Sequence, residues 1–255
     1  MKRKLHLVTL VFFLALALLG QMAAAEGGVP VPKPSVTVEQ LLRKNLAARG
    51  GEAAWSKVST MMFKGQMDVG QGMQVPYVMD LKRGRKIRVE IVFQGQTAIQ
   101  TYDVKTGYKL RPFLGRHEVE PYTQEEEAKA SWDADLDGLL IGYEARGTHI
   151  ELEGEDQVEG HKTYKLKLTT KEGQIRRVWL DAETFLEVKL EGSRRLDGKD
   201  KAADTYFRDY RTVDGVKVPF VYETAIEGVK TKGSIYVDSV ALNVPFDDTL
   251  FQRPN

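Results

Sequence analysis

Large apolar side chains occupy every second position in three successive stretches between residues 58 and 93, with mostly charged or amide side chains between them. Because neighbouring side chains of a β-strand point to opposite faces, this spacing predicts three strands of a sheet with one apolar and one polar face. Residues 70–72 and 83–85 separate the stretches and suit hairpin turns. The apolar positions include Met61, Phe63, Met67, Val75, Tyr77, Met79, Ile87, Val89, Ile91 and Phe93.

The methionine content of this face bears on its purpose. Five of the chain's seven methionines lie between Met61 and Met79. Methionine is unbranched and polarisable, so it adapts to irregular or changing apolar partners. The face is therefore either an ordinary wall of the core or the lining of a site for an apolar ligand.

The rest of the chain extends this sheet and supplies few helices to cover it. Alternating segments punctuated by turn residues recur from His149 to Leu242, so neighbouring strands pair antiparallel. Capping-box patterns predict one helix after Thr37 and a glutamate-rich helix after Thr123. We expect a mainly β fold with a few helices, in which about ten or eleven strands form a single curved antiparallel sheet within one domain, residues 37–255.

A further apolar stretch, residues 132–147, does not alternate, and it can lie over the sheet as a lid. Two helices and this stretch are too little to cover so many strands. A curved sheet with a partial lid leaves a concave apolar cavity, which is the usual place for a hydrophobic ligand. The predicted lid residues are Trp132, Leu136, Leu139, Leu140 and Tyr143.

The first 25 residues predict an export signal. Lys2, Arg3 and Lys4 precede an apolar run at residues 7–19, and small residues end at Ala25, where we expect cleavage. The alternative, an uncleaved membrane anchor, is disfavoured because the run is shorter than the ~20 residues that span a bilayer.

Composition narrows the class of protein further. Residues 26–36 form an extended, proline-rich lead. The chain contains no cysteine, which excludes disulfides and the lipid-accepting cysteine of a lipoprotein and suits a bacterial periplasm. Without the export signal the chain is close to neutral and has no basic block, so nucleic acid is not an expected partner.

One local motif matches a calcium loop on paper. Carboxylates stand at its first, third, fifth and twelfth positions and glycine at its sixth, as in an EF-hand loop. These carboxylates belong to Asp133, Asp135, Asp137 and Glu144. Ile141 at the ninth position departs from the pattern. Calcium is therefore a minor alternative to an acidic turn that enters the lid.

No constellation of residues indicates catalysis. The histidines that remain after export, His117, His149 and His161, lie far apart and lack the spacing of a zinc site. No serine lies in a Gly-x-Ser-x-Gly turn, and no glycine-rich phosphate loop occurs. We therefore expect a protein that is not an enzyme and binds no cofactor.

Turn and strand-end motifs are spread along nearly the whole exported chain, at residues 48–51, 155–168, 180–185, 207–210, 213–219 and 242–251. These motifs resemble those of the outer-membrane lipoprotein-sorting proteins, the family of the periplasmic LolA carrier and the LolB acceptor. The resemblance implies an unclosed antiparallel β-barrel with a helical lid, whose concave cavity holds the acyl chains of lipoproteins. It also implies an arginine that latches the lid, for which Arg85 and Arg88 are candidates by strand position.

The sequence thus predicts a periplasmic carrier that binds lipoprotein acyl chains or a related amphiphile and transports them toward the outer membrane. We expect a monomer whose partners are an inner-membrane donor and an outer-membrane acceptor. A non-carrier envelope scaffold or docking module with the same fold is the main alternative. A calcium-stabilised binding module is the second alternative.

Overall fold

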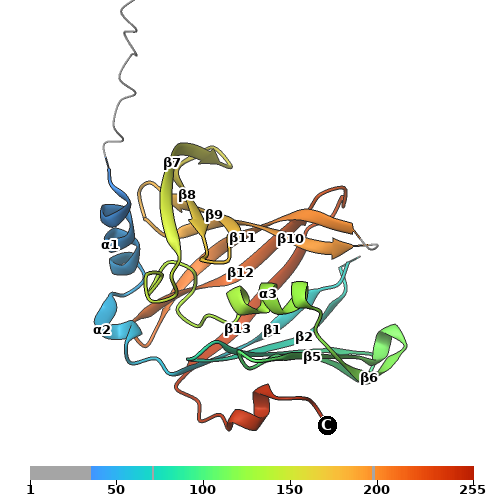
Figure 1. Cartoon of the computed structure of the whole chain (residues 1–255). Coiled ribbons are helices and arrows are strands. Elements are labelled where there is room, and N and C mark those ends of the chain that lie inside the picture. Colours follow the sequence, from blue (N-terminus) through green and yellow to red (C-terminus); the bar gives the residue numbers. More distant parts are fainter. Residues whose placement is uncertain (1–35, 71, 197–198) are drawn as a thin grey trace, which may run out of the picture. The chain divides into compact units, whose positions relative to one another are not determined.

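The computed structural model describes residues 36–70, 72–196 and 199–255 (Figure 1). The predicted signal peptide and residues 26–35 of the lead lie outside this part of the chain. Within it, thirteen strands form one antiparallel sheet in the order β6-β5-β4-β3-β2-β1-β13-β12-β11-β10-β9-β8-β7. The strands are β1 (Thr60–Asp68), β2 (Gln74–Lys82), β3 (Lys86–Phe93), β4 (Gln96–Tyr102), β5 (Gly107–Arg111), β6 (Arg116–Pro121), β7 (His149–Val158), β8 (His161–Thr169), β9 (Ile175–Asp181), β10 (Glu187–Leu196), β11 (Lys199–Val213), β12 (Val216–Ile226) and β13 (Gly233–Leu242).

The strand order explains why the sheet needs a cover. Each strand pairs with its neighbours in the chain, except that β1 pairs with β13, so the two sheet edges are β6 and β7. Although β6 and β7 follow each other in the sequence, they are not paired with each other in the described part of the chain. The sheet therefore does not close into a barrel. The connection between them must therefore pass from one edge of the sheet to the other.

The prediction of one curved antiparallel sheet in a mainly β fold is confirmed, but the predicted count of ten or eleven strands is wrong. The strand that shows no apolar alternation is β6, whose side chains include only one large aliphatic residue, Val119. Its backbone pairs with β5 at the exposed edge of the sheet, where its side chains do not pack in a core and need not be apolar. Backbone pairing without a buried face leaves little trace in a sequence.

Three α-helices and two short 3-10 helices complete the described part of the chain. Both predicted capping boxes are present, Thr37 with Gln40 at the start of α1 (Val38–Ala48) and Thr123 with Glu126 at the start of α3 (Gln124–Asp133). The other three are α2 (Glu52–Trp55), η1 (Pro112–Leu114) and η2 (Asp248–Phe251). None of the described helices has the length and apolarity required to cross a bilayer.

The connection from β6 to β7 consists of α3 and residues 134–148. The whole connection, α3 included, is here called the lid segment. Figure 1 shows α3 on the inner side of the curved sheet. The lid segment contributes Ala130, Ala134 and Leu136 to one buried cluster, and Leu140 to a second. Because these two clusters lie on different groups of strands, the lid segment binds both halves of the sheet. Sheet residues of the first cluster include Met61, Phe63, Leu81, Ile87, Val216, Val218 and Phe220, and those of the second include Ile150, Leu166, Leu168, Val178 and Leu180.

A bulge in β1 shapes the inner face. The register between β1 and β13 shifts between Lys64 and Gly65, and such bulges increase local bending and twist. A Cβ atom at Gly65 would lie 1.9 Å from the carbonyl oxygen of Tyr236, so no other residue fits without moving β13. This glycine therefore permits the close approach of the first and last strands.

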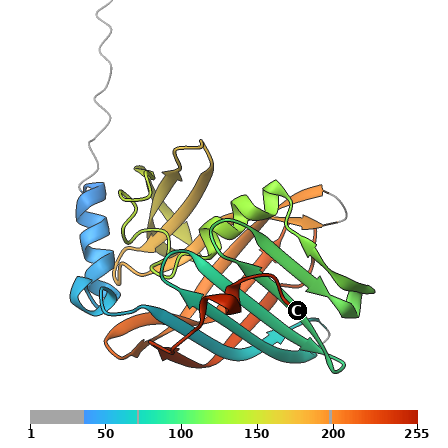
Figure 2. The same cartoon turned by 60° about the horizontal axis from the view of Figure 1, so that its bottom comes forward.

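The outer face of β1–β3 is covered by the C-terminal segment, residues 243–255, as Figure 2 shows. Lys82 Nζ donates a hydrogen bond to the carbonyl oxygen of Phe246 (2.9 Å) and Arg88 Nη1 to that of Leu250 (3.1 Å). Phe251 is fully buried and meets the ring of Phe246 edge to face. The polar face predicted for these strands is thus partly a packing surface.

Candidate ligand-binding site

The strand register places the predicted apolar residues of β1, β2 and β3 on one face, here called the apolar face. Phe63 pairs with Met79, and Met79 pairs with Val89. Met67 pairs with Val75 in the same way. Of the ten residues, five are buried and five are half-buried. The buried ones are Met61, Phe63, Val75, Tyr77 and Ile87, and the half-buried ones are Met67, Met79, Val89, Ile91 and Phe93.

The apolar face is covered unevenly. Met61 and Ile87 lie at the end where the lid segment packs, in the cluster that holds Ala130 and Leu136. Met79 and Val89 pack against this cluster, and Val75 and Tyr77 are buried, whereas Met67 of β1 and Ile91 and Phe93 of β3 stay half-buried further along their strands. An apolar surface that stays accessible on a concave face is suited to an apolar ligand.

This surface continues onto strands that the sequence analysis did not assign to the site. Ile235 of β13 pairs with Met67, and Tyr222 of β12 pairs with both Ile235 and Phe207 of β11. The rings of Phe207 and Tyr222 meet edge to face, with centroids 5.8 Å apart. The apolar alternation from Val216 to Tyr222 could have identified β12 as a strand with an apolar face. It does not reveal that this face lies on the same side of the sheet as that of β2.

Two tyrosines show how strongly the sheet curves. Desolvation raises the pKa of Tyr222 far above its usual range, and the neighbouring Tyr77 raises it further. Tyr77 stands on β2 and Tyr222 on β12, which are three strand positions apart in the sheet. The curvature therefore brings the two side chains within electrostatic reach of each other on the inner side.

Arginine side chains hold the lid segment to the rest of the fold. Arg49, at the end of α1, donates from Nη1 to the carbonyl oxygen of Asp137 (2.9 Å). Arg83 makes a two-point contact with the Asp137 carboxylate. Arg85 donates from Nε (3.1 Å) and Nη2 (2.7 Å) to the carbonyl oxygen of Ser131. Hydrogen bonds of this charge-assisted kind are among the stronger ones in proteins.

Of the two latch candidates, only Arg85 contacts the lid segment. The prediction for Arg88 is wrong, because its side chain points to the outer face and binds the carbonyl oxygen of Leu250 and the Glu90 carboxylate. Arg49 and Arg83 were missed. Their partners are backbone and carboxylate oxygens of a non-repeating segment, which no local spacing in the sequence indicates.

Arg146 organises the lid segment from within. Its guanidinium donates to the carbonyl oxygens of Gly138 (3.2 Å), Leu139 (2.8 Å) and Ile141 (2.8 Å) and pairs with Asp135 at 2.8 Å. One side chain thus satisfies several carbonyl groups in a stretch that lacks regular secondary structure.

We expect Arg146→Met to loosen residues 135–147 while the sheet stays folded. Hydrogen bonds to a charged group contribute about 1.5–3 kcal/mol each, so losing several should speed local opening at least tenfold. Hydrogen exchange at the amides of Gly138 and Gly147 measures this. Arg116→Met removes an exposed guanidinium at the β6 edge and should leave the same amides unchanged. Equal acceleration in β1–β3 would contradict the expectation.

The predicted lid residues divide between the two buried clusters. Leu136 lies in the first cluster, and Leu140 lies in the second. Trp132, Leu139 and Tyr143 pack against the second cluster, and the Trp132 indole donates to Gln174 Oε1 at 2.7 Å. The lid segment therefore packs firmly at its centre and is more exposed at its flanks.

The acidic residues of the possible calcium loop have separate partners. Asp135 pairs with Arg146 and Asp137 with Arg83, while Glu144 accepts a hydrogen bond from Tyr143. The remaining member of the loop, Asp133, pairs with Lys129 and Arg176. The described residues contain no group of three or more histidine, cysteine, aspartate or glutamate side chains that could hold a metal ion. The geometry gives the calcium alternative no support.

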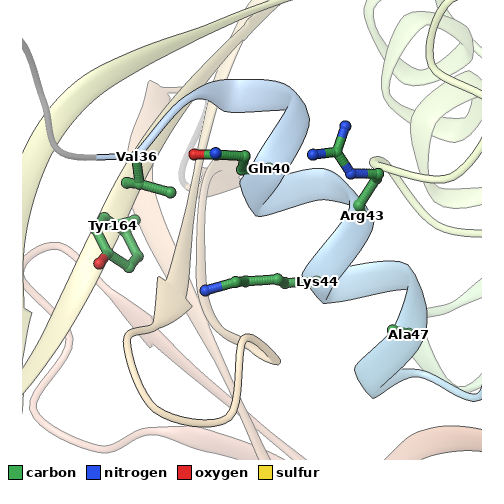
Figure 3. A pocket seen from close by; sticks show the side chains of 6 residues that line it. All are labelled: Val36, Gln40, Arg43, Lys44, Ala47 and Tyr164. Carbon is green, nitrogen blue, oxygen red and sulfur yellow. The ribbon is translucent and has the colours of Figure 1, made fainter.

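Two surface hollows lie outside the apolar face. One, of about 580 Å³, lies between α1 and β8 (Figure 3). It is lined by Val36, Gln40, Arg43, Lys44, Ala47 and Tyr164. The other, of about 430 Å³, borders α3 and includes Arg85, Trp132, Leu139 and Arg146 in its lining. Their linings contain none of the ten residues predicted on the apolar face.

Comparison with proteins of known structure identifies the fold of this chain. No protein-family model matches the sequence, and no curated protein matches it. The structure is similar to a LolA superfamily protein from Nitrosomonas europaea, with a TM-score of 0.56 and 13% identity over 86% of this chain and 99% of the other. It is also similar to a DUF1329 family protein from Desulfovibrio piger, with a TM-score of 0.55 and 13% identity over 85% of this chain and 97% of the other.

A third similar structure is a domain provisionally described as an outer membrane lipoprotein-sorting protein, from Vibrio parahaemolyticus. Its TM-score is 0.52, with 12% identity over 83% of this chain and 94% of the other. The chain therefore has the fold of the LolA-like lipoprotein-sorting proteins, as its sequence motifs predicted.

Proposed function

We propose that this protein is a periplasmic carrier that binds the acyl chains of a lipoprotein or a related amphiphile against its apolar face. The observation that carries the proposal is the half-buried apolar surface of Met67, Ile91 and Phe93 on the inner side of the curved sheet. Each acyl methylene buried there would contribute roughly 0.8 kcal/mol. A chain of ordinary length thus gains useful affinity without polar recognition.

The lid segment supports reversible binding. It is anchored by arginine side chains on carbonyl and carboxylate oxygens, and such polar contacts can be exchanged for water when the lid opens. Opening would expose Met61, Phe63 and Ile87, which pack on it in the closed state. The bound chain could then extend along the whole apolar face.

The fold of the similar structures supports this proposal at the level of architecture. An envelope location follows from the predicted export signal and would give the carrier an inner-membrane donor and an outer-membrane acceptor. We propose binding and transfer rather than catalysis, which accords with the exposed positions of His117, His149 and His161.

Met67→Asp is expected to weaken binding of a neutral apolar probe at least tenfold, because a charge would stand where the chain lies. The affinity of phenyl-naphthylamine, measured by fluorescence titration, checks this. Val69→Asp is the matched control: it places the same charge two residues later, where the side chain is 44% exposed, and should change affinity less than twofold. Circular dichroism verifies that both variants are folded.

Native mass spectrometry of the protein recovered from the periplasm gives an independent test. Co-purifying lipid or lipoprotein supports the carrier. An empty protein that also ignores the apolar probe would contradict the proposal and favour an envelope scaffold with the same fold.

A further inference from the structure

Charged side chains gather at the end of α3. Asp133 forms ion pairs with Lys129, one helical turn earlier, and with Arg176 of β9, whose Nη1 lies 3.4 Å from Asp133 Oδ1. Arg176 also stacks over the Trp132 ring, 4.9 Å from its centroid. Desolvation raises the pKa of the Asp133 carboxyl, but the surrounding cations outweigh it and hold that pKa below its usual range. Arg194 of β10 is one of these cations.

Lys129, Arg176 and Arg194 are here called the cation cluster, and its two arginines belong to the inner face of the sheet. Side chains two positions apart in a strand share a face. Arg176 precedes Val178, which is buried in the second core cluster. Arg194 follows Leu190, which packs against that cluster, by an even number of positions. Both guanidinium groups therefore stand on the side that carries the apolar face.

The cation cluster also lies across from the apolar face. β2 and β10 are five strand positions apart in the sheet, which would separate them by about 24 Å if the sheet were flat. Desolvation raises the pKa of Tyr77 on β2 far above its usual range, yet the charges of Arg194 and Asp133 both act on its hydroxyl. The curvature of the sheet thus brings these charges within reach of Tyr77.

The charges do not balance within this group. Among the described residues, the charged groups that act on Lys129 are one carboxylate, that of Asp133, and two guanidinium groups, those of Arg176 and Arg194, so positive charge is in excess around it. Guanidinium groups bind carboxylate and phosphate groups in a two-point geometry. The Asp133 side chain is 36% exposed, so an incoming anion can reach the position that its carboxylate occupies.

We propose that the ligand is an anionic amphiphile, whose acid group binds Arg176, Arg194 and Lys129 in place of Asp133 while its acyl chain lies on the apolar face. This inference rests on the proposed carrier function and adds the chemical class of the head group. Asp133 belongs to the lid segment and Arg176 to the sheet, so the same exchange breaks a link that holds α3 closed. Head-group binding and lid opening are therefore coupled.

The test compares two ligands that share one chain, palmitate and hexadecanol, by titration of the tryptophan fluorescence. We expect Arg176→Gln with Arg194→Gln to weaken palmitate binding roughly tenfold or more and to leave hexadecanol within twofold. Asp133→Asn should have the opposite effect and tighten palmitate binding, because it removes the competing carboxylate. Arg176→Lys keeps the charge and should retain most of the palmitate affinity.

Arg177→Gln is the matched control. Arg177 is the next residue of β9, on the other face, where it pairs with Glu153 and Glu191. It should leave both affinities unchanged. Equal losses for palmitate and hexadecanol in the double variant, or no loss for either, would overturn the head-group site and leave the carrier intact. If neither ligand binds the unaltered protein, the proposed function itself fails.

A competition experiment with inorganic phosphate distinguishes an amphiphile's acid group from a free anion. Inorganic phosphate should compete with palmitate only weakly, because it lacks the chain that supplies most of the binding free energy. Strong competition by inorganic phosphate that the double variant abolishes would show a site for a free anion and overturn the amphiphile.

Discussion

Replacement of Arg49 with Met is expected to lower the free energy of unfolding by about 3–5 kcal/mol, because it leaves a buried carboxylate without its cation. Arg49 Nη1 lies 3.3 Å from Glu187 Oε1, and both side chains are close to 90% buried. The guanidinium also lies over the Trp55 ring, 4.2 Å from its centroid. Denaturant unfolding, with the midpoint and slope fitted together, measures the loss.

The double variant Arg49→Met with Glu187→Gln separates the charge effect from lost packing. Removing both members of a buried pair is far less costly than removing one, so the double variant should recover most of the stability. If instead the two changes add, the cost lies in packing against Trp55 and in the bond to the Asp137 carbonyl. A loss below about 1 kcal/mol for the single variant contradicts the expected role of Arg49.

The apolar face was predictable because its signal is local. Strand alternation over residues 60–93 fixes which side chains share a face, and the hairpin turns fix the register of β1, β2 and β3. The capping boxes at Thr37 and Thr123 are local in the same way, and both predicted helix starts were right. Short-range patterns therefore recover the elements and one wall of the site.

The rest of the site depends on contacts between distant parts of the chain. Arg49 binds Asp137, 88 positions away, and Glu187, 138 positions away. The charge of Arg194 acts on Tyr77 of the apolar face only because the sheet curves, and that curvature depends on the order of strands and on the bulge at Gly65. No residue spacing encodes these distances. The arginine contacts and the position of the cation cluster across from the apolar face therefore could not be predicted from sequence patterns.

Replacement of Asp80 with Asn is expected to stabilise the protein at neutral pH by up to about 3 kcal/mol. Asp80 stands on β2, is 7% exposed, and its Oδ1 has no hydrogen-bond partner among the described residues. Desolvation, with a smaller contribution from the charge of Glu90, raises the pKa of Asp80 from 3.8 to about 6. Arg88 opposes the shift only in part, since it also binds Glu90 and the Leu250 carbonyl.

The pH dependence of this effect has a definite sign. A carboxyl whose pKa is higher in the folded state stabilises the fold when protonated, so this contribution is complete below about pH 4 and is lost as the pH rises through about 6. The stability gained by Asp80→Asn should therefore be close to zero at pH 4, grow up to pH 6, and stay constant above it. Urea unfolding of both proteins across this range measures the difference, and other titrating groups cancel in it. Asp238→Asn, at an exposed position of β13, should show no such growth. A difference that does not vary with pH would mean that Asp80 keeps its ordinary pKa in the folded protein.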